Sequence, residues 1–169
     1  ATIAREYRKL LNGYAQETGM PPEFVQWQGH DFSFRGMSSL ESAFLSGMGH
    51  LLSFTGTDTI PAIDALEQYY NADADKELIG GSVPATEHSV MCMGGECDEE
   101  ETFRRLIEDV YPSGIVSIVS DTWDFWEVLN AYLPQLRAII LSRDGKLVVR
   151  PDSGDPVKII CGAPESGIQ

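Results

Sequence analysis

Residues 115–121 read Ile-Val-Ser-Ile-Val-Ser-Asp, and this stretch decides the fold class. Its β-branched residues predict a buried strand over Ile115–Val119, because a short apolar run is typical of strands that are covered on both faces. Ser120 or Asp121 can cap a helix that we expect to run to Leu133, just before a proline. The stretch therefore predicts a strand followed at once by a helix.

The same alternation continues on both sides of this stretch. Further strands are expected at Leu51–Phe54, Gly80–Val83 and Leu147–Arg150, and a strand end that runs into a loop at His30–Gly36. Apolar residues at 3.6-residue spacing predict helices, at Thr2–Tyr14, from a cap at Ser38 or Ser39 to Met48, and at Thr59–Tyr70, Thr86–Met93 and Glu101–Tyr111. Strands that alternate with helices predict parallel strands with helices outside. About four to five strands are too few for an eight-stranded barrel, so the α/β chain is either a small open sheet or part of a barrel.

Composition narrows the class of protein. The 169 residues are enough for about one domain, and 43% of them are hydrophobic, enough for a sizeable core. The formal net charge of −14 argues against a nucleic-acid or anionic-membrane partner. No apolar run approaches the roughly 20 residues of a membrane span, and the polar, helical start argues against a signal peptide.

The cysteines and the chain ends carry further expectations. Cys92, Cys97 and Cys161 do not have zinc-site spacing, so we expect reduced thiols and a cytoplasmic location. The chain begins inside a helical pattern, and residues 163–167 have the composition of a loop. Both ends are therefore expected to be cuts or processing sites.

Two loop motifs carry carboxylates directly after predicted strands. Gly56–Thr59 reads Gly-Thr-Asp-Thr, and Arg150–Pro156 reads Arg-Pro-Asp-Ser-Gly-Asp-Pro. In α/β folds the loops after strands hold the chemistry. Asp58 and Asp152 could orient a ligand amide, ribose hydroxyls or Mg²⁺ there, or could simply cap turns.

Histidine and arginine add candidate groups to these loops. His88 lies near a predicted helix start, where a neutral, proton-accepting imidazole is favoured, although an exposed or core histidine is the commoner case. Arg35 and Arg150 could bind phosphate, or form structural ion pairs. Phe32, close to Arg35, suits a planar ring or core packing. Together these residues predict a site for a polar, phosphorylated small molecule.

Five segments in this order resemble the nicotinamide phosphoribosyltransferase family. They are His30–Ala43, Phe54–Thr59, Gly81–Ser89, Val116–Asp124 and Leu147–Pro156. The resemblance implies that residues 1–169 are the central part of a type II phosphoribosyltransferase barrel, a partial TIM-like barrel. The family's N-terminal domain and the C-terminal half of its barrel would be absent.

The resemblance implies a reaction in which nicotinamide and phosphoribosyl pyrophosphate give nicotinamide mononucleotide and pyrophosphate, with Mg²⁺. Phe32 would stack on the pyridine ring, Arg35 would contact ring and phosphate, and Asp58 would accept a hydrogen bond from the carboxamide. Ser82, Val83 and Ser117 would line the pocket. Arg150 and Asp152 would lie at the ribose and phosphate end.

His88 would be the histidine that is phosphorylated when ATP hydrolysis is coupled to the reaction, and Asp121 its partner. The resemblance also implies a homodimer whose partner subunit supplies an aromatic residue. No metal-ligating residue is assigned. Nicotinate phosphoribosyltransferase and a non-catalytic fragment with an incomplete site stay open as alternatives. A Mg²⁺-dependent phosphohydrolase fits the carboxylates but not the order of the motifs.

Overall fold

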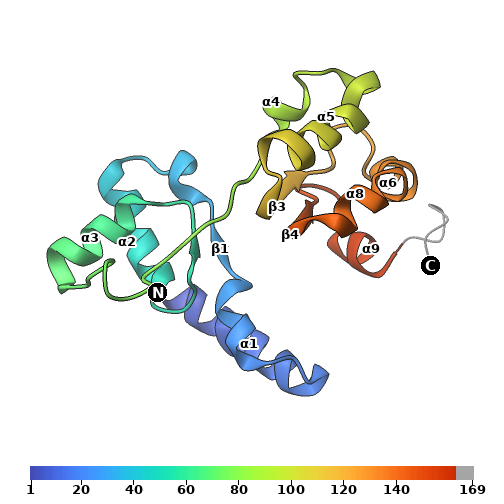
Figure 1. Ribbon diagram of the computed structural model, residues 1–169. Helices are drawn as coiled ribbons and strands as arrows, with labels where there is room; N and C mark the ends of the chain where they lie inside the picture. The colour runs from blue at the N-terminus through green and yellow to red at the C-terminus, as the bar shows by residue number, and fades with distance from the viewer. Residues whose placement is uncertain (163–169) are drawn as a thin grey trace. The chain divides into compact units, whose positions relative to one another are not determined.

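The computed structural model describes residues 1–162, and the chain divides into two compact units. The first unit is Ala1–Ser82 and the second begins at Val83 (Figure 1). Each unit mixes helices with parallel strand pairing, so the expected α/β class is confirmed. The loop expected at residues 163–167 lies outside the described residues.

The first unit is mainly helical, around a short parallel strand pair. Its elements are α1 (Thr2–Thr18), the 3₁₀ helix η1 (Pro22–Trp27), β1 (His30–Asp31), the 3₁₀ helix η2 (Ser33–Gly36), α2 (Leu40–Leu51), β2 (Gly56–Thr57) and α3 (Pro61–Tyr70). Strands β1 and β2 are parallel, with His30 opposite Gly56. A parallel bridge between Gly56 and Gly81 adds a third segment.

Helices α2 and α3 pack closely in this unit. Of the two expected caps, Ser38 and Ser39, it is Ser39 that caps α2, because its hydroxyl accepts a hydrogen bond from the Ser42 amide at 3.1 Å. Met48 and Ala65 are buried between the helices. A Cβ atom at Gly47 would lie 2.6 Å from the Cβ of Ala62, so glycine permits the close approach.

The second unit is built on a longer parallel strand pair. Strand β3 (Ser113–Val119) pairs with β4 (Asp144–Arg150) over the full length of both. The helical elements are α4 (His88–Met91), η3 (Glu96–Asp98), α5 (Glu99–Arg105), the π-helix η4 (Leu106–Val110), α6 (Phe125–Glu127), the π-helix η5 (Val128–Tyr132), α7 (Leu133–Gln135), α8 (Arg137–Ser142) and α9 (Pro156–Cys161).

Helices lie around β3 (Figure 1), and the core of this unit forms between the strand and these helices. Val116, Ile118 and Val119 of β3 are fully buried. They pack against Leu136 between α7 and α8, and against residues of the surrounding helices, namely Met91, Phe103, Leu106, Ile107 and Val128. The predicted strand at Ile115–Val119 is therefore confirmed, although Ile115 itself is 42% exposed.

Two glycines face each other near the start of the β3–β4 ladder. Gly114 has a φ of 74° and lies opposite Gly145. A Cβ atom at Gly145 would lie 1.9 Å from the carbonyl oxygen of Gly114. No side chain fits there, so the strands approach more closely at this pair than L-residues allow.

Some local predictions are wrong. Residue Leu51 ends α2, and the strand expected at Leu51–Phe54 instead forms as β2 at Gly56–Thr57. The cap of the helix after β3 is not Ser120 or Asp121. Asp124 caps α6, since its carboxylate accepts hydrogen bonds from the amides of Trp126 and Glu127.

The strand predicted at Gly80–Val83 is also wrong, because Gly81 makes only an isolated bridge with Gly56. The other predicted elements form with shifted boundaries. Helix α1 extends four residues beyond its predicted end at Tyr14, up to Thr18. Strand β4 begins at Asp144 instead of Leu147. In the described part of the chain no helix is both long enough and apolar enough to cross a membrane.

Candidate functional site

The first cluster of site residues lies where three parallel segments of the first unit end. The Asp58 amide donates to the carbonyl of Asp31 at 2.9 Å, and the Thr57 amide donates to the carbonyl of Gly81 at 3.0 Å. Because parallel segments end at the same edge, Phe32, Asp58 and Ser82 are brought to one edge of this unit.

Asp58 accepts two hydrogen bonds on one of its carboxylate oxygens. Nε2 of His30 lies 3.1 Å from Oδ1 of Asp58, and the hydroxyl of Ser82 donates to the same oxygen. The other oxygen, Oδ2, accepts no hydrogen bond from residues 1–162. The side chain is 40% exposed, so Oδ2 is available to a donor from outside the protein.

An aromatic ring and a guanidinium lie beside this carboxylate. Phe32, Phe34, Arg35 and Asp58 line a cavity of about 390 Å³. Phe32 is 44% exposed. One of its contacts is with the imidazole of His30, with ring centroids 4.3 Å apart and planes 28° apart. A partly exposed aromatic ring with a carboxylate beside it suits a planar ring that carries a hydrogen-bond donor.

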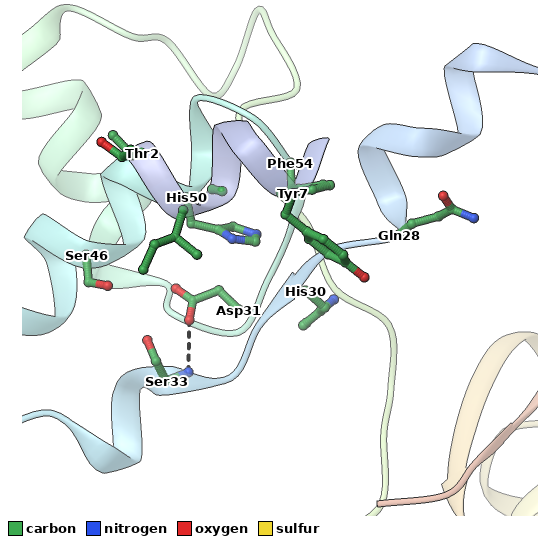
Figure 2. Close-up of a pocket in the computed structure, with 13 residues that line it drawn as sticks. Thr2, Tyr7, Gln28, His30, Asp31, Ser33, Ser46, His50 and Phe54 are labelled. Atoms are coloured by element: carbon green, nitrogen blue, oxygen red, sulfur yellow. Dashed lines mark hydrogen bonds between the residues drawn. The ribbon is translucent and has the colours of Figure 1, made fainter. Parts of the chain in front are cut away.

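Asp31 fixes the turn that presents Phe32 and Arg35. Figure 2 shows it beside a second cavity, of about 740 Å³, with the Ser33 amide donating to its carboxylate at 2.9 Å. Asp31 is 8% exposed. Burial raises the pKa of Asp31, but the interactions with Ser33 and with nearby His50 outweigh it, so that the pKa is lowered. The carboxylate thus stays ionised and holds the first turn of η2.

A second cluster lies in the second unit and is centred on Asp121. Nε2 of His88 lies 3.2 Å from Oδ1 of Asp121. Oδ2 of Asp121 accepts hydrogen bonds from the Asp152 amide at 2.9 Å and from the Ser153 hydroxyl at 2.6 Å. One carboxylate therefore joins the loop after β3 to the loop after β4 and to the start of α4.

The environment keeps Asp121 ionised. Its side chain is 7% exposed. Burial raises the pKa of Asp121, but hydrogen bonds from Ser153, from the Asp152 amide and from His88 together lower it below 3.8. An ionised Asp121 selects the His88 tautomer that carries its proton on Nε2 and leaves Nδ1 unprotonated.

Backbone pairing brings Arg150, at the end of β4, close to the segment that leads to His88. The Ser117 amide donates to the carbonyl of Pro84, and the Thr86 amide donates to the carbonyl of Ser117. Residues 84–86 thus run beside β3. Nη2 of Arg150 donates to the carbonyl of Thr86 at 2.6 Å, just before His88 in the chain.

Ser117 and Val83 are the two remaining residues that were predicted to line the pocket. Ser117 is 6% exposed within β3, where its backbone joins the segments on both sides. Val83 is 36% exposed and begins the second unit. Their predicted role in lining a pocket stays a prediction.

Sequence reasoning missed His30, which contacts both Phe32 and Asp58. The sequence did contain an indication of this contact. Residues two apart on a strand point to the same face, and His30 is two residues before Phe32 in a segment that was predicted to be a strand end. Gly56 is also part of this contact. A Cβ atom at position 56 would lie 2.7 Å from Nδ1 of His30.

A comparison with family models matches residues 27–164 to the nicotinate phosphoribosyltransferase (NAPRTase) family. A nicotinamide phosphoribosyltransferase of Acinetobacter baylyi is 60% identical over 98% of this chain and 34% of its own length. One of Mycoplasma pneumoniae is 43% identical over 95% of this chain and 32% of its own. One of Xanthomonas campestris pv. campestris is 34% identical over 95% of this chain and 34% of its own length. The chain spans about a third of the length of these curated relatives.

Proposed function

Because the chain belongs to the nicotinate phosphoribosyltransferase family, we propose that it serves the transfer of a phosphoribosyl group to nicotinamide in pyridine nucleotide salvage. The donor is phosphoribosyl pyrophosphate, and the products are nicotinamide mononucleotide and pyrophosphate. Similarity to relatives that are named nicotinamide phosphoribosyltransferases supports this proposal.

The observation that carries the choice of base is the free Oδ2 atom of Asp58. Nicotinamide presents an amide NH₂ group, which can donate to this oxygen. Nicotinate presents a carboxylate, and two carboxylates at hydrogen-bond distance repel each other. Phe32 offers a ring face and Arg35 a positive charge in the same cavity. The site of this chain therefore favours nicotinamide, although the family model is named after nicotinate.

In the proposed reaction the pyridine nitrogen forms a bond to C1 of the ribose. The bond between C1 and the pyrophosphate oxygen breaks, and pyrophosphate leaves with the electron pair. Catalysis of such a displacement consists mainly of positioning and charge stabilisation. Arg150, held by the Thr86 carbonyl, supplies positive charge for a phosphate.

We propose that Mg²⁺ binds together with the pyrophosphate group of the substrate. Among residues 1–162 no three His, Cys, Asp or Glu side chains form a group that could hold a metal ion. Mg²⁺ keeps several waters and binds one or two carboxylates together with substrate phosphates. The Asp152 carboxylate accepts no hydrogen bond within the described part of the chain, so it is available for that role. When bound, Mg²⁺ would neutralise charge on the pyrophosphate.

ATP is proposed as a coupled substrate that phosphorylates His88. Nδ1 would attack the γ-phosphorus of ATP, and ADP would leave with the electrons of the broken bond. The support is the contact between His88 and the ionised Asp121, which leaves Nδ1 as a nucleophile.

We also propose a fold for the whole protein, a cellular location and an assembly. The parallel segments with carboxyl-end site residues support a partial TIM-like barrel, of which residues 1–169 are the central part. Free, exposed cysteines support a reducing cytoplasm. Ile3, Leu10 and Tyr14 of α1 are each more than half exposed, which supports burial in an assembly such as a homodimer.

The test is product formation from each base. We would exchange the aligned segment of the Acinetobacter baylyi relative for this chain and supply phosphoribosyl pyrophosphate, Mg²⁺ and either base. Mass spectrometry should detect nicotinamide mononucleotide from nicotinamide and much less product from nicotinate. Product from nicotinate alone would favour the nicotinate alternative. No product from either base would overturn the proposal and favour a segment without a working site.

A further inference from the structure

One imidazole contacts both groups that are proposed to bind the base. His30 stacks on Phe32 and lies 3.1 Å from Oδ1 of Asp58. The face of the ring and its Nε2 atom are therefore used in different contacts.

The contacts of His30 restrict the rotation of Asp58. Its Nε2–H and the Ser82 hydroxyl both donate to Oδ1. Two donors on one oxygen fix the plane of the carboxylate, because rotation about its last bond would break both hydrogen bonds. Oδ2, which accepts nothing from residues 1–162, is thereby held in one direction.

The His30 ring is itself held on a third side. Its Nδ1 edge lies against Gly56, where a Cβ atom would come within 2.7 Å of Nδ1. The side chain is only 26% exposed. The ring therefore has little room to turn away from Asp58.

From this geometry we propose that His30 is a positioning residue that sets the preference for nicotinamide over nicotinate. The proposal rests on the proposed function. With His30 in place, Oδ2 meets the amide NH₂ of nicotinamide in a fixed direction. Without the donor, the Asp58 carboxylate can rotate, and the hydrogen bond to nicotinamide weakens. Nicotinate gains nothing from that hydrogen bond, so its reaction changes little.

The test separates the donor of His30 from its ring, in the chimera with the Acinetobacter baylyi relative. His30→Phe keeps a ring on Phe32 but removes the donor. His30→Gln removes the ring but keeps an N–H donor of similar reach. For His30→Phe we expect the ratio of kcat/KM for nicotinamide over nicotinate to fall about tenfold, through a higher KM for nicotinamide. For His30→Gln we expect the ratio to stay within about threefold of the parent.

His50→Phe is the matched control. It removes another imidazole of the first unit, which contacts the Gly56 carbonyl and not Asp58. We expect it to lower the Tm and to leave the ratio unchanged. If His30→Phe does not fold, His30→Asn replaces it, since its amide is too short to reach Asp58.

Two results would overturn the inference. One is an unchanged ratio in His30→Phe, and the other is a parallel loss with both bases, which indicates a purely structural role. An unsubstituted chimera that makes no nicotinamide mononucleotide would contradict the proposed function itself. The two failures are thus distinguishable.

Discussion

Oδ1 of Asp121 lies 3.2 Å from Nε2 of His88, and its Oδ2 binds the loop after β4 through Asp152 and Ser153. The same carboxylate thus orients an imidazole and ties two loops together. The ionised carboxylate accepts all of these hydrogen bonds, and they in turn help to lower the pKa of Asp121.

Phosphorylation of His88 is the first prediction. Incubation of the chimera with γ-labelled ATP should place an acid-labile phosphate on His88. Asp121→Asn should reduce the labelling about tenfold, because a neutral amide no longer selects the tautomer with Nδ1 free. Asp109→Asn, at an exposed position, is the control and should label normally. Equal labelling of His88→Gln would contradict the assignment.

The stability of the chain should depend on Asp121 in a pH-dependent way. Its folded pKa is lowered, so its stabilisation is present above the ordinary value of 3.8 and is lost as the pH falls through the folded pKa. Asp121→Asn should cost about 1–3 kcal/mol near neutral pH. Urea unfolding of both proteins should show this difference shrinking below about pH 4. A constant difference would speak against the ionised carboxylate as its source.

Asp58→Asn should change the choice of base. The amide NH₂ of asparagine can donate to the carboxylate of nicotinate, and the repulsion by Asp58 is gone. We expect the nicotinamide-over-nicotinate ratio of kcat/KM to fall by about 10–100-fold. Asp64→Asn makes the same charge change on the exposed face of α3 and should leave the ratio unaltered.

Glu99 should destabilise the chain at high pH. Burial, followed by repulsion from Glu127, Asp124 and Glu96, raises the pKa of Glu99 to about 7. Its Oε1 atom has no hydrogen-bond partner in the described structure. A raised pKa favours folding below the ordinary value of 4.5, and this advantage is lost as the pH rises through 7.

Glu99→Gln tests this directly, since glutamine carries no charge at any pH. In urea unfolding it should be more stable than the parent by about 2–3 kcal/mol at about pH 8, and by less than about 1 kcal/mol at about pH 5. Glu101→Gln is the control, because the Glu101 side chain is 71% exposed. A gain at pH 5 as large as at pH 8 would show that repulsion and burial of charge are not the cause.

Arg143 should matter for the C-terminal end of the π-helix η4. Its Nη1 donates to the carbonyls of Ile107 and Tyr111, and its Nη2 to that of Gly114 at 3.3 Å. Arg143→Lys should lower the free energy of unfolding by about 1–2 kcal/mol, because an ammonium cannot satisfy three carbonyls in this fork geometry. Arg137→Lys, on an exposed arginine, should change it little.

The sequence predicted strand β3 and most helices correctly because their apolar patterns are long. It misplaced β2, since a short apolar run such as Leu51–Phe54 cannot be told from a helix end by periodicity. It also assigned the wrong cap to α6. Asp124 and Glu127 stand three apart in the capping-box pattern, which was the better signal. Asp121 is instead used by the loop after β4.

The candidate site depended on resemblance for the roles of Asp58, His88 and Asp121. The sequence could not reveal that Ser82 and His30 share one oxygen of Asp58, because the three residues are far apart in the chain and only strand pairing joins them. The bond from Ser153 to Asp121 is of the same kind. Contacts between loops of different strands require the register of the sheet.

The glycine pair Gly114–Gly145 fixes the register on which the second cluster depends. The same number of residues separates Gly114 from Val119 and Gly145 from Arg150, and Val119 and Arg150 are paired at the far end of the ladder. A one-residue insertion in either strand would leave the glycines in contact but misalign the loops that carry Asp121 and Asp152. A change in the length of one strand would therefore impair the contacts of Asp121 at the carboxyl end of the ladder, although the glycine pair at the opposite end would stay intact.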